Sequence, residues 1–302
     1  MPKSRPQKPD SITGPVTAAQ ARAEGLERWQ LRDAGLHRIH RDLWVPSDQA
    51  GDLSTRCAAA LRMLPDGSAV SHLTAARLRG LPVPAPLPDE PVHALVPAAK
   101  HPRVEGIHVH RVRGPYEAVE LRSGLLVAGA ARTWADLAPY LNRDDLVVLG
   151  DSMLNRNLTT RQLIGAELEA GRGRRGVSAA RAVLALLEPK ADSPGETRTR
   201  LLLIDKGIGG FVVNEVIRDE DGEWLCRPDI HFQPPMVLLE YQGEHHFADP
   251  RQRRRDIRKH EVMRDRGWTV LEIVSADLHR ERRKLTATRI RDAVERRTRR
   301  TA

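Results

Sequence analysis

The stretch CRPDIHFQPPMVLLEYQGEHHF, residues 226–247, decides the fold of the C-terminal part of this 302-residue chain. Two apolar runs flank QPPM (233–236), a composition that predicts a turn between two strands. A hairpin centred between the two prolines places Asp229 directly opposite Glu240, with their Cβ atoms about 5 Å apart. Gln242 then shares the face of Glu240, because side chains alternate along a strand. The stretch therefore predicts two opposed carboxylates on one face of a sheet.

Two opposed carboxylates destabilise a sheet unless something neutralises them. Leu238 and Leu239 mark the second strand as largely buried, which raises the cost of an unpaired charge. One solution is bound Mg²⁺, with Mn²⁺ as an alternative, because such ions take carboxylate oxygens, waters and phosphate oxygens. The other is an ion-paired hairpin in which Arg227 or the following basic segment supplies the positive charge. The hairpin thus predicts either a metal site at Asp229 and Glu240 or a structural ion pair.

The elements around the hairpin predict an α/β domain over residues 190–302. Ser193-Pro194-Gly195-Glu196 opens a helix, with proline in the first turn and a Ser-x-x-Glu capping box. Strands are expected at 211–217, 223–232, 237–243 and 267–274, and helices at 251–266 and at the C-terminus. The predicted order is therefore α-β-β-β-α-β-α.

Pro228-Asp229 followed by Glu240-Tyr241-Gln242 resembles the PD-(D/E)XK signature of restriction-endonuclease-like nucleases. The ordered motifs resemble more closely the very-short-patch-repair (Vsr)-like domain family of uncharacterised bacterial proteins. The residues that fit the pattern of that family are Glu196, Asp229, Glu240, Gly243, His246, Asp256, Lys259, Gly267, Trp268 and Val270. The resemblance covers about residues 190–290. It implies a restriction-endonuclease-like fold that hydrolyses DNA phosphodiester bonds with Mg²⁺.

The resemblance also implies a role for each residue of the site. The two hairpin carboxylates would hold Mg²⁺, which polarises the scissile phosphate and lowers the pKa of a bound water. Gln242 stands where the nuclease signature usually has lysine; it would orient the attacking water, but an amide cannot act as a base. His246 or Lys259 would then transfer the proton. Glu196 would ligate a water or a second ion, or only cap its helix.

The net charge of +9 comes entirely from the C-terminal 52 residues. Residues 251–302 carry 18 Lys and Arg against 8 Asp and Glu, whereas residues 1–250 carry 31 against 32. A one-sided positive field favours a polyanion as partner. Duplex DNA fits best, because aromatic residues that stack on single strands form only 4% of the chain. A solvated helix face is the alternative. Backbone contacts are expected from Arg253, Arg254, Arg255, Arg258 and Lys259.

Residues 11–50, after a flexible lead over 1–10, predict a winged helix-turn-helix. Short helices are expected at 18–24, capped by Thr17, and at about 27–34. The segment LHRIHRDLWVP (36–46) would form the β-ribbon. The second helix would present Arg28, Gln30 and Arg32 to a DNA groove, unless the module is purely structural.

This N-terminal part resembles the winged-helix region of AbiEi-type antitoxins of abortive-infection systems. The S-H-x-x-A-A-x-L-x-G-L-P run at residues 71–82 fits proteins that join that region to the nuclease-like domain. The resemblance implies binding to DNA.

Residues 51–189 predict a mixed α+β region without a legible function. Helices are expected at 54–64, 71–80, 131–141, 144–154, 159–170 and 177–187, and strands at 92–97 and 106–112. His93, His108 and His110 fall on these strands, where alternating polar residues are the default and a metal site is the alternative. A zinc site from Cys226, His245, His246 and His260 has no supporting ligand spacing.

Composition excludes several classes of protein. No apolar run approaches the roughly 20 residues of a membrane span, and no secretory h-region is present, so a cytoplasmic protein is expected. Two cysteines, Cys57 and Cys226, cannot form a disulfide framework. The oligomeric state stays open, with a homodimer as one arrangement.

Three functions remain compatible with the sequence. The first is a Mg²⁺-dependent endonuclease acting on duplex DNA, in DNA repair or phage defence. The second is a DNA-binding regulator of antitoxin type whose nuclease-like domain is inactive. The third is an interaction protein without a nucleic-acid role, which leaves the basic segment unexplained.

Overall fold

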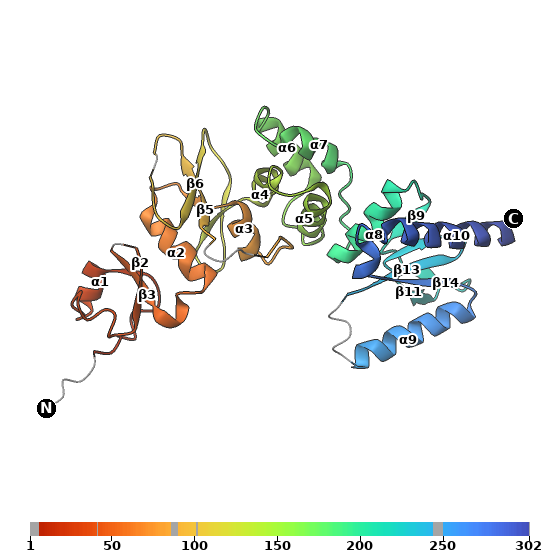
Figure 1. Cartoon of the computed structure of the whole chain (residues 1–302), viewed down its shortest axis with the longest axis horizontal. Coiled ribbons are helices and arrows are strands. Elements are labelled where there is room, and N and C mark those ends of the chain that lie inside the picture. Colours follow the sequence, from red (N-terminus) through yellow and green to blue (C-terminus); the bar gives the residue numbers. More distant parts are fainter. Residues whose placement is uncertain (1–5, 41, 86–89, 101, 244–249, 302) are drawn as a thin grey trace. The chain divides into compact units, whose positions relative to one another are not determined.

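The computed structural model describes residues 6–40, 42–85, 90–100, 102–243 and 250–301, and the chain divides into two compact units (Figure 1). The first unit is Met1–Pro139 and the second is Tyr140–Ala302. Both mix helices and strands, which confirms the α/β class. The division falls at residues 139 and 140, whereas the sequence placed boundaries near residues 50 and 189. No described helix combines the length and apolar character needed to cross a bilayer.

The first unit begins with a small three-stranded module. Its elements are β1 (Val16–Thr17), α1 (Ala18–Ala23), β2 (Leu36–His40) and β3 (Leu43–Pro46). The strand order is β1-β3-β2, and all pairs are antiparallel. Thr17 caps α1 as predicted, with its side chain accepting from the amide of Gln20. The β2–β3 ribbon is also confirmed.

The second predicted helix of this module, 27–34, does not form. Residues 28–35 make consecutive turns instead, with backbone hydrogen bonds of three-, four- and five-residue spacing. Gly25 and Gly35 have positive φ angles and leave only nine residues between them, too few to stabilise an isolated helix. Arg28 and Arg32 are exposed on these turns, and the side-chain oxygen of Gln30 accepts from the amide of Glu27. The three residues predicted for a DNA groove therefore lie on a turn segment.

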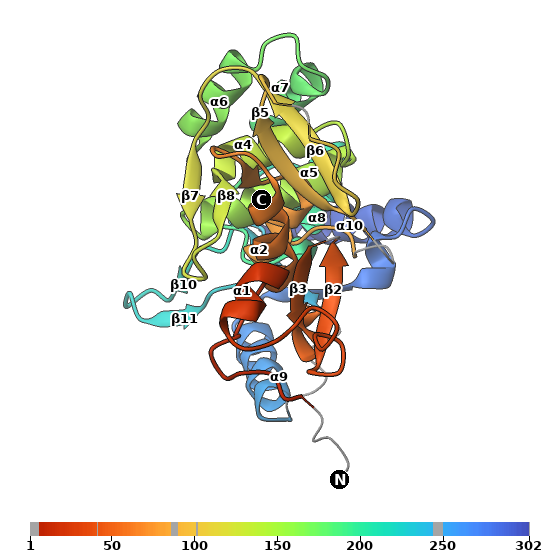
Figure 2. The ribbon, with the colours of Figure 1, turned by 90° about the vertical axis from the view of Figure 1, so that its left-hand side faces the viewer.

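The rest of the first unit is a five-stranded sheet with helices. The elements are η1 (Ser47–Gln49), α2 (Leu53–Met63), β4 (Ala69–Val70), α3 (His72–Leu78), β5 (Val92–Pro97), β6 (Ile107–Val112), β7 (Ala118–Glu120), β8 (Leu126–Ala128) and α4 (Ala130–Leu137). The strand order is β6-β5-β4-β8-β7, and β5 and β6 run parallel (Figure 2). The two strands predicted in this region, 92–97 and 106–112, are confirmed.

The second unit opens with three helices that the sequence predicted, α5 (Arg143–Asn155), α6 (Arg161–Ala170) and α7 (Val177–Leu184). A buried ion pair joins α5 to α8 (Pro194–Asp205), the helix that follows α7 in the chain. Oδ2 of Asp151 lies 2.8 Å from Nη2 of Arg200 and accepts from the hydroxyl of Thr197, while Oδ1 accepts from the amide of Glu188. These bonds satisfy a carboxylate that is almost wholly buried.

A four-stranded sheet forms the centre of the second unit. Its elements are α8, β9 (Phe211–Val213), β12 (Ile230–Phe232), β13 (Val237–Gln242), α9 (Pro250–Asp265), β14 (Thr269–Val274) and α10 (Arg283–Thr301). The strand order is β14-β13-β12-β9, antiparallel except for the parallel pair β13–β14. These elements follow the predicted order α-β-β-β-α-β-α, but the predicted strands 211–217 and 223–232 are each broken, into β9 and β10 and into β11 and β12. A separate ribbon, β10 (Ile217–Arg218) with β11 (Trp224–Cys226), and the short helix η3 (Ser275–Leu278) complete the unit.

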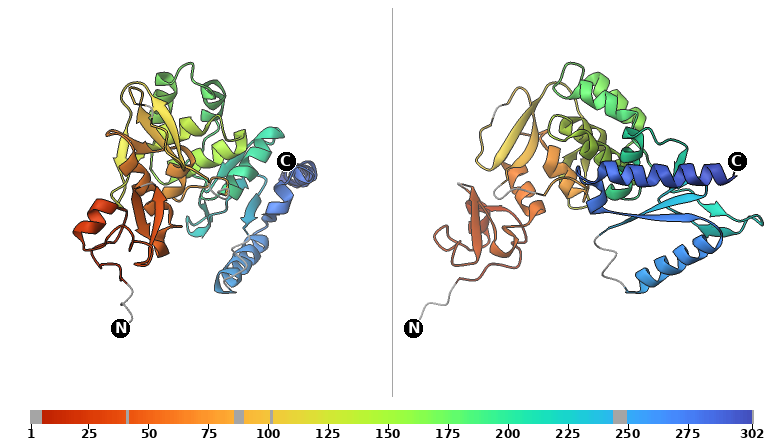
Figure 3. Two further views of the ribbon diagram at one scale, coloured as in Figure 1. Left: turned by 60° about the vertical axis from the view of Figure 1, so that its left-hand side comes forward. Right: turned by 45° about the vertical axis from the view of Figure 1, so that its right-hand side comes forward.

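Helices cover both faces of this sheet, with α8 and α10 on one face and α9 on the other (Figure 3). Val237 and Leu239 pack toward α8 and α10, whereas Leu238 packs with Met263 of α9 and with Trp268. Residues of β13 therefore alternate between two buried faces, which explains the continuous apolar run at its start.

Candidate active site

The hairpin β12–β13 has the predicted register. Ile230 pairs with Leu239 and Phe232 with Val237, so the next position along the register opposes Asp229 and Glu240. Both carboxylates lie on the α9 face, because Glu240 has the parity of Leu238 in the strand. The backbone amide of Tyr241 donates to Oδ2 of Asp229 at 2.6 Å.

Asp229 is a carboxyl group held in an unfavourable environment. Burial, followed by the charges of Glu240 and Glu196, raises the pKa of Asp229 to about 8. The amide of Tyr241 and the charge of Lys259 only partly oppose these effects. Part of the Asp229 side chain still reaches solvent. Such a group gains from a cation that approaches from solvent.

Glu240 is buried and has a lysine as its partner. Nζ of Lys259, from α9, lies 2.6 Å from Oε1 of Glu240 and also donates to the carbonyl of Arg227. The basic segment therefore supplies a charge to one of the two hairpin carboxylates. Arg227, the other expected partner, instead pairs with Asp192 at 2.9 Å.

Glu196 lies in the first turn of α8, and it is buried. The hydroxyl of Ser193 accepts from the amide of Glu196, as predicted for the cap. The reciprocal half of the predicted capping box does not form: the carboxylate of Glu196 accepts from the amide of Asp192 at 2.9 Å, and not from that of Ser193, and it also accepts from Nδ2 of Asn214 at 2.5 Å. The residue therefore stabilises the start of its helix and also contributes negative charge beside Asp229.

The other predicted catalytic and backbone-binding residues are placed only in part. Gln242 is half-buried on β13 and shares the face of Glu240, as expected. Arg258 is exposed on α9. The predictions that lie outside the described residues or side chains are His246 and the side chains of Arg253, Arg254 and Arg255.

Two polar features near the site escaped the sequence analysis. Asn214, with a φ of 48°, directly follows β9, and its side chain donates to Glu196. The sequence signal was an asparagine after an apolar strand, since asparagine tolerates this conformation. On the α9 face, Glu272 of β14 is the register neighbour of Glu240, and its Oε1 lies 3.2 Å from Nδ1 of His260.

The cysteine–histidine zinc alternative gains no support. The thiol of Cys226 is buried against the sulfur of Met263, and His260 contacts Glu272. His245 and His246 lie outside the described residues.

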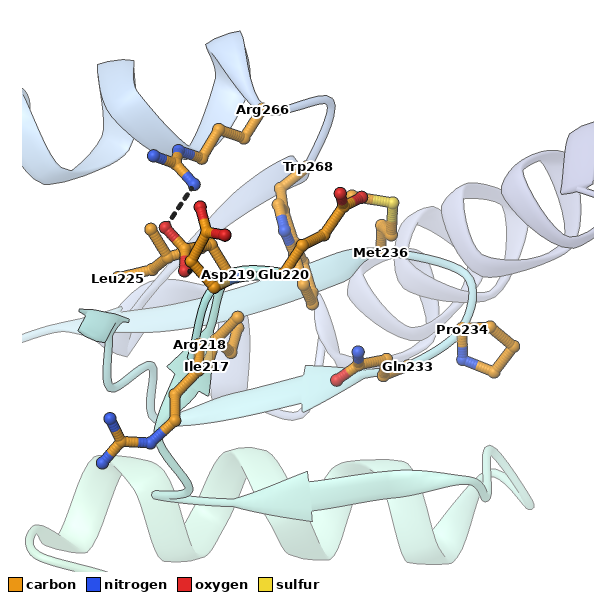
Figure 4. A pocket seen from close by; sticks show the side chains of 11 residues that line it. Ile217, Arg218, Asp219, Glu220, Leu225, Gln233, Pro234, Met236, Arg266 and Trp268 are labelled. Carbon is orange, nitrogen blue, oxygen red and sulfur yellow. Dashed lines mark hydrogen bonds and ion pairs between the residues drawn. The ribbon is translucent and has the colours of Figure 1, made fainter. Parts of the chain in front are cut away.

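An open cleft of about 660 Å³ lies at the other end of the hairpin (Figure 4). It is bordered by the turn residues Gln233 and Met236, by Trp268, and by Asp219, which pairs with Arg266 at 3.3 Å. Asp229 and Glu240 do not line the cleft, because they lie at the end of the hairpin that is far from its turn. It is not part of the carboxylate site.

No family model matches the chain. The chain is 30% identical over 259 residues to an uncharacterised protein of Mycobacterium tuberculosis, named MT2308 in one strain and Rv2248 in another. The match covers 85% of this chain and 92% of the mycobacterial protein. The chain belongs to the family of these mycobacterial proteins. Because the matched stretch is longer than either compact unit, it includes parts of both.

Proposed function

We propose that this protein is a Mg²⁺-dependent endonuclease that hydrolyses duplex DNA at the carboxylates of the second unit. The observation that carries the proposal is the clustering of Asp229, Glu240 and Glu196, with the pKa of Asp229 raised to about 8. Bringing these like charges together costs the fold stability at Asp229, so a function that needs the charges is the better account. The restriction-endonuclease-like fold is part of the proposal and rests on the order of the elements.

Mg²⁺ suits the site, because this ion needs only one or two protein carboxylates when substrate phosphate and water complete its shell. Asp229 and Glu240 would hold the ion, with Mn²⁺ as a substitute, and Glu196 would bind a water of the shell. The ion would polarise the scissile phosphate and lower the pKa of the attacking water. For Glu240 to bind, its carboxylate must exchange Lys259 for the metal.

Lys259 would supply the ammonium group that position 242 lacks. The signature places a lysine on the strand, whereas this chain has a lysine of α9 whose Nζ lies 2.6 Å from Glu240. After Glu240 turns to the metal, that ammonium group would be available to stabilise the developing charge on phosphate or to move a proton. Gln242 would orient the water through its amide.

The basic segment provides the attraction to DNA. Residues 251–302 hold the whole positive excess of the chain, and α9 in that segment packs beside the site face. Exposed Arg258 and the arginines at 253–255 would contact backbone phosphates, so affinity should fall steeply with salt. Duplex DNA is the proposed substrate, because few aromatic side chains are available to stack on single strands, and the cytoplasm is the proposed location.

The test is cleavage of supercoiled plasmid and of an end-labelled duplex in Mg²⁺ or Mn²⁺. Asp229→Asn and Glu240→Gln should lower the cleavage rate at least 100-fold, because each removes a metal ligand. Asp221→Asn, an exposed acid in the same unit, is the matched control and should cleave like wild type. Cleavage that survives Asp229→Asn, or that needs no divalent ion, would refute the proposal.

A DNA-binding regulator of antitoxin type is the second candidate, and Gln242 favours it because the position lacks the usual lysine. In that case the carboxylates would be a relic, and duplex binding would depend on exposed Arg28 and Arg32 of the first unit. Binding lost in Arg28→Ala together with Arg32→Ala, without cleavage under any metal, would select this function.

A further inference from the structure

The first unit contains a group of buried histidines that the proposed nuclease does not use. His72 opens α3, His93 lies in β5 and His110 lies in β6. Among the described residues, these three form a group that offers one ligand atom each, all within 4.8 Å of one another. His72 and His93 are buried and His110 is half-buried. The carboxylates of the second unit do not reach this degree of convergence.

The distances fit a small metal ion. A tetrahedral Zn²⁺ with Zn–N bonds of about 2.0–2.1 Å needs nitrogens about 3.3 Å apart. Nδ1 of His93 lies 2.9 Å from Nε2 of His110, and no pair of the three ligand atoms exceeds 4.8 Å. Shifts of about 1.5 Å or less would therefore complete the geometry. The ring of His72 stacks on that of His110, with centroids 3.5 Å apart.

The sheet itself creates this cluster. His93 is the register neighbour of His108 on the parallel strand, and His110 follows two residues later on the same face. The ring of His108 stacks 4.5 Å from that of His110 and 5.0 Å from that of His93. His108 is exposed and lies outside the group of three converging ligand atoms, so water would complete the shell.

The backbone at His72 is shaped around its ring. His72 has a φ of 51°, a left-handed conformation that costs a non-glycine residue about 1 kcal/mol. Ser71 is the N-cap residue of α3, but its hydroxyl makes no cap bond and lies 3.0 Å from Nδ1 of His72. A serine cap is worth roughly 1 kcal/mol to a helix. Both features lower the local stability of α3, and both are tied to the position of the His72 imidazole.

A carboxylate stands behind the same ring. Oδ2 of Asp136, in α4, lies 4.0 Å from Nδ1 of His72, and Nε of Arg132 holds both carboxylate oxygens of Asp136 at 2.8 Å. Metal-binding histidines characteristically have an oxygen partner on the far ring nitrogen that fixes their orientation. The hydroxyl of Ser71 occupies that place here, and Asp136 lies one shell further out.

The rings are also in the form that binds a metal. Burial is the largest cause that lowers the pKa of His72 to about 2, of His93 to about 4 and of His110 to about 3. The neighbouring imidazoles add to this effect. Burial disfavours the charged form of an imidazole, and the neutral form is the one that binds Zn²⁺.

From this geometry we infer that His72, His93 and His110 bind one transition-metal ion, and that Zn²⁺ is the preferred ion. The bound ion would join α3 to the β5–β6 edge of the sheet. Neutral imidazole ligands favour Zn²⁺ over Mg²⁺, so the site is distinct in chemistry from the carboxylate site. His93 and His110 share a hydrogen bond, and two metal–nitrogen bonds would replace it when the ion binds.

The test titrates the full chain, stripped of metal, with Zn²⁺ by calorimetry and with Co²⁺ by visible absorption. One equivalent of Zn²⁺ and the intense bands of a four- or five-coordinate Co²⁺ are expected from the wild type. His110→Gln should weaken binding at least 100-fold, and Ser71→Ala about 10-fold, because it removes an orienting partner. The matched control is His37→Gln, an exposed histidine of the same unit, which should bind like wild type.

Each result has one meaning. Absence of Zn²⁺ binding by the folded wild-type protein overturns the inference, whatever the variants do. Zn²⁺ that is kept in His110→Gln but lost in Asp229→Asn belongs to the carboxylate site and also overturns it. Zn²⁺ that is kept in Asp229→Asn and lost in a folded His110→Gln supports the histidine site, independently of any nuclease activity.

Discussion

Asp229→Asn is expected to stabilise the second unit near pH 8 and to change it little near pH 4. Burial, then the charges of Glu240 and Glu196, raise the pKa of Asp229 from 3.8 to about 8 in the folded chain. Between these values the folded state holds a proton that the unfolded state has lost. Stability is therefore greatest below the unfolded pKa and falls as the pH rises toward the folded pKa. Asparagine carries no charge, so the variant lacks this loss.

The size of the effect follows from the same pKa. Each pKa unit corresponds to 1.36 kcal/mol, so a carboxyl group with a pKa of about 8 loses at most about 4 kcal/mol of stability by pH 7. Because Asp229 is partly exposed, solvent reduces this figure, and a gain of about 2–4 kcal/mol is expected for the variant. The amide oxygen of asparagine can still accept from the amide of Tyr241.

The assay is urea unfolding of the full chain at pH 4, 6 and 8 in EDTA. Hydrogen exchange at the amides of β12 and β13 reads the second unit separately. Asp221→Asn, exposed in the same unit, should show the pH dependence of the wild type. Loss of stability in Asp229→Asn near pH 8, or an unchanged slope between pH 4 and 8, would show that the carboxylate is not strained. Mg²⁺ should stabilise wild type but not Asp229→Asn.

Three further changes test the packing and the ion pairs of the second unit. Asp151→Ala should lower the free energy of unfolding by about 3–5 kcal/mol in urea, because it leaves Arg200 buried without its carboxylate; a loss under 1 kcal/mol would contradict this. Gly195→Ala should lower the thermal midpoint by an amount equivalent to about 1–3 kcal/mol, because the added Cβ would collide with the ring of Tyr241. Lys259→Ala should lower the free energy of unfolding by about 1–3 kcal/mol near pH 7, because it removes a partner of buried Glu240. It should also slow DNA cleavage. A variant that is as active and as stable as wild type would exclude both roles of Lys259.

Local rules in the sequence predicted much of the second unit. The two prolines placed the centre of the hairpin, and alternation then decided which side chains share a face, so the register that pairs residues 230–232 with 237–239 is confirmed. The serine cap of α8 and the order of helices and strands are confirmed for the same reason, since each depends on residues within a few positions of one another.

Local rules failed where the segment was too short or the partner was distant. Residues 27–34 have the composition of a helix, but glycines at both ends leave too little length for one, and turns form instead. Gly195 predicted only the start of a helix. In the structure, the ring of Tyr241 occupies the space that a side chain at position 195 would fill. Neither outcome can be read from spacing alone.

The α/β class, the hairpin and the excess of positive charge at the C-terminal end follow from the amino-acid sequence alone. The pairing of Lys259 with Glu240, and the contact of His72 with His93 and His110, depend on how the folded segments pack. The physical reason is that strand pairing and capping follow from neighbouring residues. Contacts between a helix and a sheet depend instead on how distant segments pack, which no short pattern encodes.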